Sequence, residues 1–200
     1  GGMAMVLSPG TGEILAMATA PSFNPNAPAR GPVEARKNRS LTDSFEPGST
    51  FKAFLMAGAL DAGLVSNDDL FDTGEGWMRV PGKTIRDHHP YGVLDAAGVL
   101  RVSSNVAAVQ IAQRLGPQRQ FEALGRFGFG RATQSGFPSE SSGLLRSWRN
   151  WKPVDQATVA FGQGVGVTPV QLAYATAALA NGGERMRPRL VLAQRKSLGN

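Results

Sequence analysis

Two apolar runs near the start of the chain constrain its fold most, because neither is patterned for a surface exposed to water. Residues 3–7 (Met-Ala-Met-Val-Leu) and 14–18 (Ile-Leu-Ala-Met-Ala) flank residues 8–12 (Ser-Pro-Gly-Thr-Gly). Serine, proline and glycine are typical of tight turns, so the two runs predict a β-hairpin. Neither run alternates apolar with polar residues, which indicates strands covered on both faces. A lone hairpin is marginal in water, so this one needs neighbours.

The rest of the sequence predicts helices joined by long connections. Residues 21–48 hold five prolines and predict one such connection. A small hairpin is predicted within residues 70–86, turning at Pro81 and Gly82, and residues 190–193 could begin a further strand. Apolar spacing, caps and breakers predict helices at 49–61, 95–101, 105–115, 118–127 and 169–180, with a loop at 131–153.

These elements predict a mixed fold of the α/β class in the α+β arrangement, with helices beside an antiparallel sheet. The sheet is incomplete, because the opening hairpin lacks partners among the predicted strands. We expect the missing strands either beyond residue 200 or from another molecule. As a prior, a chain of 200 residues makes one domain or two small ones.

Composition narrows the classes of function. The net charge is +6, but the basic residues are scattered and no aromatic platform accompanies them, so we expect no nucleic-acid binding. A solvated basic face near an anionic membrane or cell wall explains the charge as well. The chain has no cysteine, which excludes disulfides and thiol nucleophiles. It has no apolar run long enough to span a membrane. His88 and His89 lack spaced carboxylates, so we expect no metal site. Gly128-x-Gly130 and Gly162-x-Gly164 lack the strand-to-helix context of a dinucleotide site, so we expect no cofactor.

The sharpest chemical signal is Ser49, followed three residues later by Lys52 at the start of a predicted helix. At this spacing both side chains lie on one helix face. A serine hydroxyl is a weak nucleophile until a base takes its proton, and a lysine is such a base only when burial keeps it neutral. The helix N-terminus would also direct backbone N–H groups at a developing anion. The alternative is an N-cap serine with a solvated lysine.

A second signal is Ser103-Ser104-Asn105, just before another predicted helix. The hydroxyl of Ser103 could relay a proton, and the amide of Asn105 could bind a peptide carbonyl. The alternative is again a helix cap, because serine and asparagine are favoured there.

Other patterns are weaker. Gly82-Lys83-Thr84 lacks the preceding glycine and the strand-to-helix context of a phosphate-binding loop. No Gly-x-Ser-x-Gly sequence is present, which argues against a hydrolase that uses histidine as its base.

Together, in this order, the two motifs resemble those of the penicillin-binding proteins and serine β-lactamases, whose signature is Ser-x-x-Lys, Ser-x-Asn and Lys-Thr-Gly. The surrounding sequence narrows the resemblance to class B penicillin-binding proteins, and among these to the division-type (septal) members. The similarity runs through essentially the whole chain. The segments that carry it are residues 11–26, 38–52, 87–91, 103–107, 161–173 and 181–183.

The resemblance implies the fold and the reaction of a serine D,D-transpeptidase that cross-links peptidoglycan stem peptides in septal wall synthesis. It implies that Ser49 is the nucleophile, Lys52 its base and Ser103 the relay to the leaving amine. Asn105 would bind substrate and help to place Lys52, and the backbone N–H of Ser49 would be one oxyanion donor. β-Lactam antibiotics would acylate the same serine. The resemblance also implies an extracytoplasmic location, a membrane anchor in the parent protein and divisome membrane proteins as partners.

One family motif, Lys-Thr-Gly, is not found within these 200 residues. Lys83-Thr84 is followed by Ile85 and precedes Ser103, so it does not correspond to that motif. We therefore expect residues 1–200 to be the core of a transpeptidase domain, without the anchor, the pedestal and the final sheet strands. The alternative function is a catalytically incomplete module that binds cell-wall peptide or a divisome partner without turnover.

Overall fold

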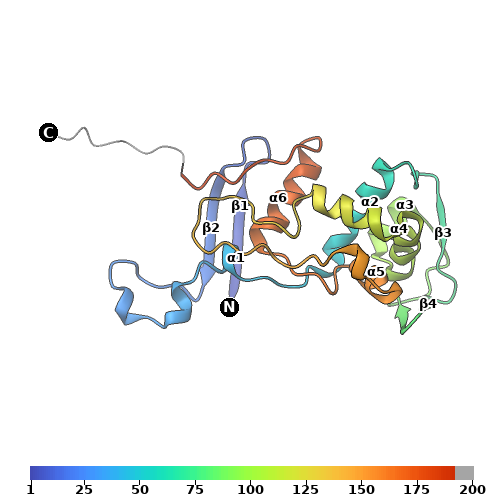
Figure 1. Cartoon of the computed structure of the whole chain (residues 1–200), viewed down its shortest axis with the longest axis horizontal. Helices are drawn as coiled ribbons and strands as arrows, with labels where there is room; N and C mark the ends of the chain where they lie inside the picture. The colour runs from blue at the N-terminus through green and yellow to red at the C-terminus, as the bar shows by residue number, and fades with distance from the viewer. Residues whose placement is uncertain (192–200) are drawn as a thin grey trace. The chain divides into compact units, whose positions relative to one another are not determined.

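The structure is a computed structural model that describes residues 1–191, and the chain divides into two units (Figure 1). The first, termed the hairpin unit, comprises residues 1–44, 131–143 and those from 168 onward. The second, termed the helical unit, comprises residues 45–130 and 144–167. The strand expected at 190–193 lies partly outside the described residues, although Arg189 forms a parallel bridge with Glu13.

The predicted opening hairpin is confirmed. Strand β1 (Gly2–Leu7) pairs antiparallel with β2 (Ile14–Ala20), and the register shifts between Val6 and Leu7. One face of the hairpin packs against a small cluster of Leu41, Val170 and Tyr174, which are buried. Its side chains in that contact are Met5, Leu7, Ile14 and Met17.

The other face of the hairpin is not covered by the described residues. Val6 remains 55% exposed and Leu15 63% exposed. The expectation that the hairpin lacks strand partners therefore holds within residues 1–191, since β1 and β2 form a sheet of two strands. Apolar side chains on an uncovered sheet face are typical of a surface that another element covers.

Helix α6 (Pro169–Ala180) lies beside the hairpin and ends where the sequence predicts (Figure 1). It begins with the predicted capping box, in which the Thr168 hydroxyl accepts from the Gln171 N–H and the Gln171 side chain accepts from the Thr168 N–H. The connection before residue 45 contains only short turns of helix: η1 (Pro28–Arg30), η2 (Val33–Arg36) and α1 (Arg39–Thr42).

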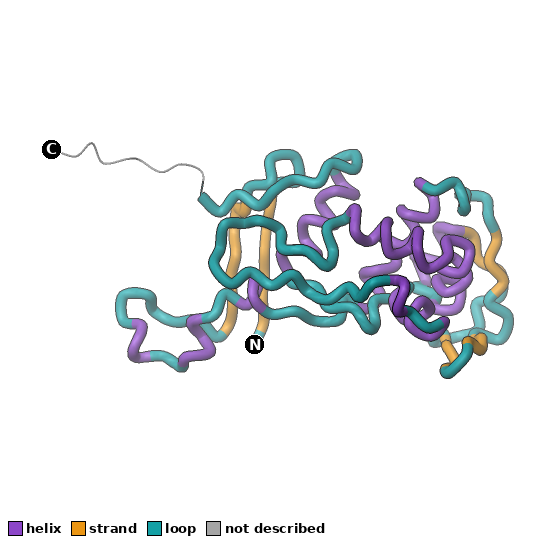
Figure 2. Tube along the Cα trace, in the orientation of Figure 1, coloured by secondary structure: helices purple, strands orange, loops and turns teal. Residues whose placement is uncertain are grey.

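Helices dominate the helical unit, and its strands are short (Figure 2). The predicted helix at 49–61 consists of a 3₁₀ turn, η3 (Gly48–Phe51), and helix α2 (Lys52–Asp61). The two helices predicted at 105–115 and 118–127 are confirmed: they are the two parts of α4 (Asn105–Arg126), separated by non-helical backbone at Gly116 just before Pro117. The other helical elements are α3 (Ala96–Val102), η4 (Trp148–Asn150) and α5 (Pro153–Val159), the last two of which the sequence did not predict.

The predicted small hairpin is confirmed as β4 (Trp77–Val80) and β5 (Lys83–Arg86). Residues 70–76 do not belong to it, because β3 (Leu70–Asp72) pairs instead with β6 (Val93–Asp95). Both short sheets pack on a core shared with α2, α3, α4 and α5, whose buried members include Leu55, Phe71, Ile85, Val99 and Ile111. This core fixes the elements that carry both predicted motifs.

Candidate active site

Ser49 lies in the 3₁₀ turn that leads into α2, with its side chain exposed. The residue before it, Gly48, has a φ of +58°, which favours glycine. The N–H of Gly48 donates to the Gly162 carbonyl over 3.1 Å. A Cβ on Gly162 would lie 2.2 Å from the Gly48 oxygen, so only glycine fits there. The segment around Gly162 therefore supports the backbone that positions Ser49.

Lys52 is buried, with 3% of its surface exposed, one turn after Ser49. Its Nζ donates to Ser49 Oγ at 3.2 Å, to Ser103 Oγ at 2.9 Å and to the Ser103 carbonyl at 2.5 Å. The structure therefore brings three of the four predicted side chains into one hydrogen-bonded cluster. Ser103 reaches Lys52 from the other motif, 51 positions along the chain.

Burial changes the acid–base chemistry of Lys52. Desolvation lowers the pKa of Lys52 from 10.5 to about 8, and the negative charge of Asp87 opposes part of this shift. A neutral amine is thus far more populated near neutral pH than on an exposed lysine. An amine in that state, 3.2 Å from a serine hydroxyl, can accept its proton.

Ser103 adopts a left-handed backbone conformation, with φ of 57° and ψ of 45°. It is the C-cap of α3, and its N–H donates to the Leu100 carbonyl. Ser104 is the N-cap of α4, where its hydroxyl accepts from the Ala107 N–H at 3.0 Å. Ser103 therefore occupies a tight junction between two helices, a conformation that costs free energy for a residue with a side chain.

Asn105 is the first residue of α4, and its side-chain amide donates to the Arg86 carbonyl at 2.9 Å. Among the described side chains, Lys52 bonds to the two serines and not to Asn105. The expected role of Asn105 in placing Lys52 therefore stays a prediction, and the structure shows it anchored to the end of β5.

No sequence motif assigns a role to Asp87, which the structure places against the second motif. Its carboxylate accepts from the Ser104 hydroxyl at 2.6 Å, from the Asn105 N–H at 2.5 Å and from the Val106 N–H at 3.1 Å. No local pattern could reveal this, because the partners lie 17 or more positions along the chain. The resemblance of residues 87–91 to a family segment was the only signal.

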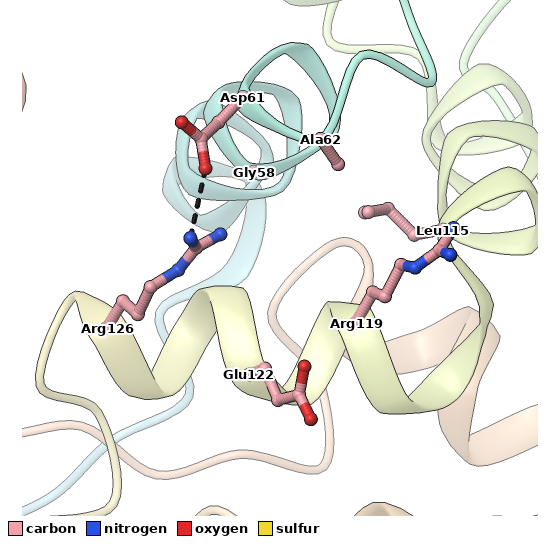
Figure 3. A pocket seen from close by; sticks show the side chains of 7 residues that line it. All are labelled: Gly58, Asp61, Ala62, Leu115, Arg119, Glu122 and Arg126. Carbon is pink, nitrogen blue, oxygen red and sulfur yellow. Dashed lines mark ion pairs between the residues drawn. The ribbon is translucent and has the colours of Figure 1, made fainter.

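A separate hollow of about 310 Å³ lies near the other end of α2, lined by seven residues (Figure 3). Four of these are charged, and one pair of them, Arg126 and Asp61, is joined by an ion pair at 3.0 Å. The hollow contains none of the predicted site residues. Its lining is Gly58, Asp61, Ala62, Leu115, Arg119, Glu122 and Arg126.

Within residues 1–191, no group of three or more histidine or acidic side chains is placed to hold a metal ion. No helix in that range is both long enough and apolar enough to cross a membrane.

Helices with short antiparallel sheets, and Ser-x-x-Lys and Ser-x-Asn motifs joined through one buried lysine, define the class of the penicillin-binding proteins and serine β-lactamases. Comparison with known proteins narrows that class. Residues 2–198 match the family described as "Penicillin binding protein transpeptidase domain". The chain belongs to this family.

Several curated relatives resemble the chain. The "Probable peptidoglycan D,D-transpeptidase PenA" of Neisseria gonorrhoeae is 41% identical over 182 residues, which is 91% of this chain and 31% of that protein. The "Peptidoglycan D,D-transpeptidase FtsI" of Escherichia coli is 41% identical over 177 residues, 88% of this chain and 30% of that protein. The chain thus spans less than a third of each of these relatives.

Solved structures give the same fold. The transpeptidase domain of penicillin-binding protein 3 from Burkholderia pseudomallei matches with a TM-score of 0.85 and 36% identity, over 96% of this chain and 54% of that one. A structure titled as a peptidoglycan glycosyltransferase from Burkholderia ambifaria matches with a TM-score of 0.86 and 35% identity, over 99% of this chain and 58% of that one. The predicted fold class is therefore confirmed.

Proposed function

We propose that this chain carries the acylation site of a peptidoglycan D,D-transpeptidase that acts in septal wall synthesis. One observation carries the proposal: a buried lysine with a lowered pKa bonds both to an exposed serine at a helix start and to a second serine. That arrangement suits acyl transfer through a serine ester. Relatives whose names include D,D-transpeptidase, FtsI among them, support the choice of substrate.

In the proposed reaction, neutral Lys52 takes the proton of Ser49 while Oγ attacks the carbonyl between the two terminal D-alanines of a stem peptide. The C–O bond forms, and the carbonyl oxygen becomes an oxyanion near the Ser49 N–H. That N–H belongs to the first turn of a helix, where backbone donors lack intrahelical partners.

Collapse of the oxyanion breaks the peptide C–N bond. The proton held by Lys52 passes through the Ser103 hydroxyl to the nitrogen of the departing D-alanine, and an acyl-enzyme remains. The 2.9 Å contact between Lys52 Nζ and Ser103 Oγ supplies the path. The amine of a second stem peptide then attacks the ester carbonyl and gives its proton through Ser103 to Lys52. The C–N bond forms, the ester C–Oγ bond breaks, and Lys52 returns the proton to Ser49 Oγ. The product is a cross-link between two peptides.

The proposal includes the acylation of Ser49 by β-lactams and a location outside the cytoplasm, where peptidoglycan is cross-linked. It also includes divisome membrane proteins as partners of the full natural gene product. We propose residues 1–200 as the core of one transpeptidase domain built from the two units.

Labelling with a fluorescent penicillin tests the proposal in the full natural gene product. Wild type should label, and Ser49→Ala should lose labelling entirely. Ser66→Ala is the matched control, because Ser66 is an exposed serine of the same unit whose hydroxyl, among the described residues, bonds to Asp69 alone. Equal labelling of wild type and Ser49→Ala would overturn the assignment.

A second candidate function is a module that binds wall peptide or a divisome partner without turnover. Mass spectrometry of the 200-residue chain after penicillin treatment separates the two. A stable adduct supports acylation chemistry, and its absence from both this chain and the full natural gene product supports the module.

A further inference from the structure

We propose that Asp87 is a positioning residue of this site: by bonding the first turn of α4, it holds Ser103 in the strained conformation that presents two oxygens to Lys52. This inference rests on the proposed function and extends it to a residue outside the motifs. Asp87 itself touches neither Ser49 nor Ser103 through any hydrogen bond of the described residues.

Both oxygens of the Asp87 carboxylate accept hydrogen bonds at the start of α4. One oxygen accepts the N–H groups of Asn105 and Val106, and the other accepts the Ser104 hydroxyl. The Ser104 hydroxyl in turn accepts from Ala107. A carboxylate at the first turn of a helix is favoured both by these free N–H groups and by the helix dipole. Asp87 therefore fixes the position of this turn from outside the helix.

Ser103 is fixed from the other side by α3. The N–H groups of Ser103 and Ser104 donate back to the Leu100 and Val99 carbonyls, which closes the end of that helix. Between these two anchors the chain has one left-handed residue, Ser103. That conformation directs both the carbonyl and the hydroxyl of Ser103 to Lys52 Nζ. Loosening the α4 anchor lets Ser103 relax toward a commoner conformation and removes these acceptors.

Asp87 is itself held in place. Its N–H donates to the Gly76 carbonyl at 2.8 Å, and the preceding carbonyl, that of Arg86, accepts from the Asn105 side chain. The end of β5 is thus docked on α4 at two neighbouring residues.

Asp87 also acts on Lys52 at a distance, since its negative charge favours the protonated amine. The other charged or titratable groups on the elements packed around the site are exposed to solvent, which screens them. They are Glu46 before η3, Lys83 and Arg86 on β5, His88 and His89 in the next loop, and Arg101 on α3. Removing the charge at position 87 therefore has a readout that loss of a helix cap alone lacks.

The test is the rate of acylation by a fluorescent penicillin between pH 6 and pH 9.5, in the full natural gene product. For Asp87→Asn we expect the plateau rate at high pH to fall between about tenfold and a hundredfold, because Ser103 is misplaced. We also expect the rising limb of the profile to move to lower pH, because Lys52 loses the charge that favours its proton.

Two further variants separate the causes. Asp87→Glu keeps the charge and moves the carboxylate, so its plateau should fall while its rising limb stays at the wild-type pH. Asp95→Asn is the matched control, because Asp95 caps the neighbouring helix α3 through the Gly98 N–H at 2.6 Å. Asp95→Asn should keep the plateau rate of acylation within about twofold of wild type, and the rising limb of its pH–rate profile should stay at the wild-type pH.

A plateau within about twofold of wild type for Asp87→Asn would overturn the inference, and so would an unmoved limb. So would equal effects of Asp87→Asn and Asp95→Asn. If Asp87→Asn does not fold, Ser104→Ala removes one of the three bonds and should lower the plateau without moving the limb. Failure of the proposed function looks different, since wild type itself would then show no labelling at Ser49.

Discussion

Lys52 is the residue on which the proposed chemistry depends, because its amine meets both serines. Burial lowers its pKa to about 8. In the proposed reaction the neutral amine is the active form, so the acylation rate should rise with pH, pass its midpoint near 8 and level off above that value. The rate of penicillin acylation against pH measures this directly.

Lys52→Arg tests the same point by substitution. A guanidinium stays protonated at every accessible pH, so this variant should lose acylation by at least about a thousandfold, whatever the pH. A variant that kept a rising limb near pH 8 would show that another group is the base.

At the scale of single elements, the turn that carries Ser49 depends on its approach to Gly162. A Cβ on Gly162 would lie 2.2 Å from the Gly48 oxygen and 2.6 Å from its nitrogen, so Gly162→Ala must displace the Ser49 turn. We expect acylation to fall by about a hundredfold, and the free energy of unfolding to fall by about 2–4 kcal/mol.

Gly74→Ala is the matched control for this prediction. Gly74 also has a positive φ, of +50°, but nothing lies within 4 Å of its added Cβ. It should cost only about 1 kcal/mol in urea unfolding and leave acylation unchanged. Equal losses in both variants would show that backbone strain, and not the contact with Gly48, explains the effect.

The packing of α2 on α4 gives a second prediction at this scale. A Cβ on Gly58 would lie 2.6 Å from the Ala123 Cβ, so Gly58→Ala should lower the free energy of unfolding by about 1–3 kcal/mol. Ala123→Gly removes the obstructing methyl group. The double variant should recover part of the loss, and additive losses in a double-mutant cycle would contradict the close contact.

The sequence predicts those elements whose signals are turn residues, caps and short apolar runs close together in the chain. The opening hairpin, the turn at Pro81 and Gly82 and the capping box of α6 all have their signals within a few residues. The pairing of β3 with β6 was missed because it joins segments about twenty residues apart, and no local pattern records a partner. Helix α5 was missed because it has only seven residues, too few to show helical periodicity.

At the scale of the whole molecule, sequence again predicts contacts between near neighbours and misses those between distant segments. Ser49 and Lys52 are neighbours on one turn, so their pairing follows from spacing, whereas Ser103 reaches Lys52 only because α2, α3 and α4 share a core. The resemblance to a family supplied that link at the start. For Asp87 the resemblance of residues 87–91 supplied the segment but no role, since that role depends on the docking of β5 against α4.

The most direct test of the central claim is to locate the adduct after penicillin treatment of the full natural gene product. Trypsin releases residues 40–52 as one peptide, which contains Ser49 and ends at Lys52. Tandem mass spectrometry should find one intact penicillin added to this peptide, with the fragments assigning it to Ser49. An adduct on another peptide, or none at all, would contradict the account.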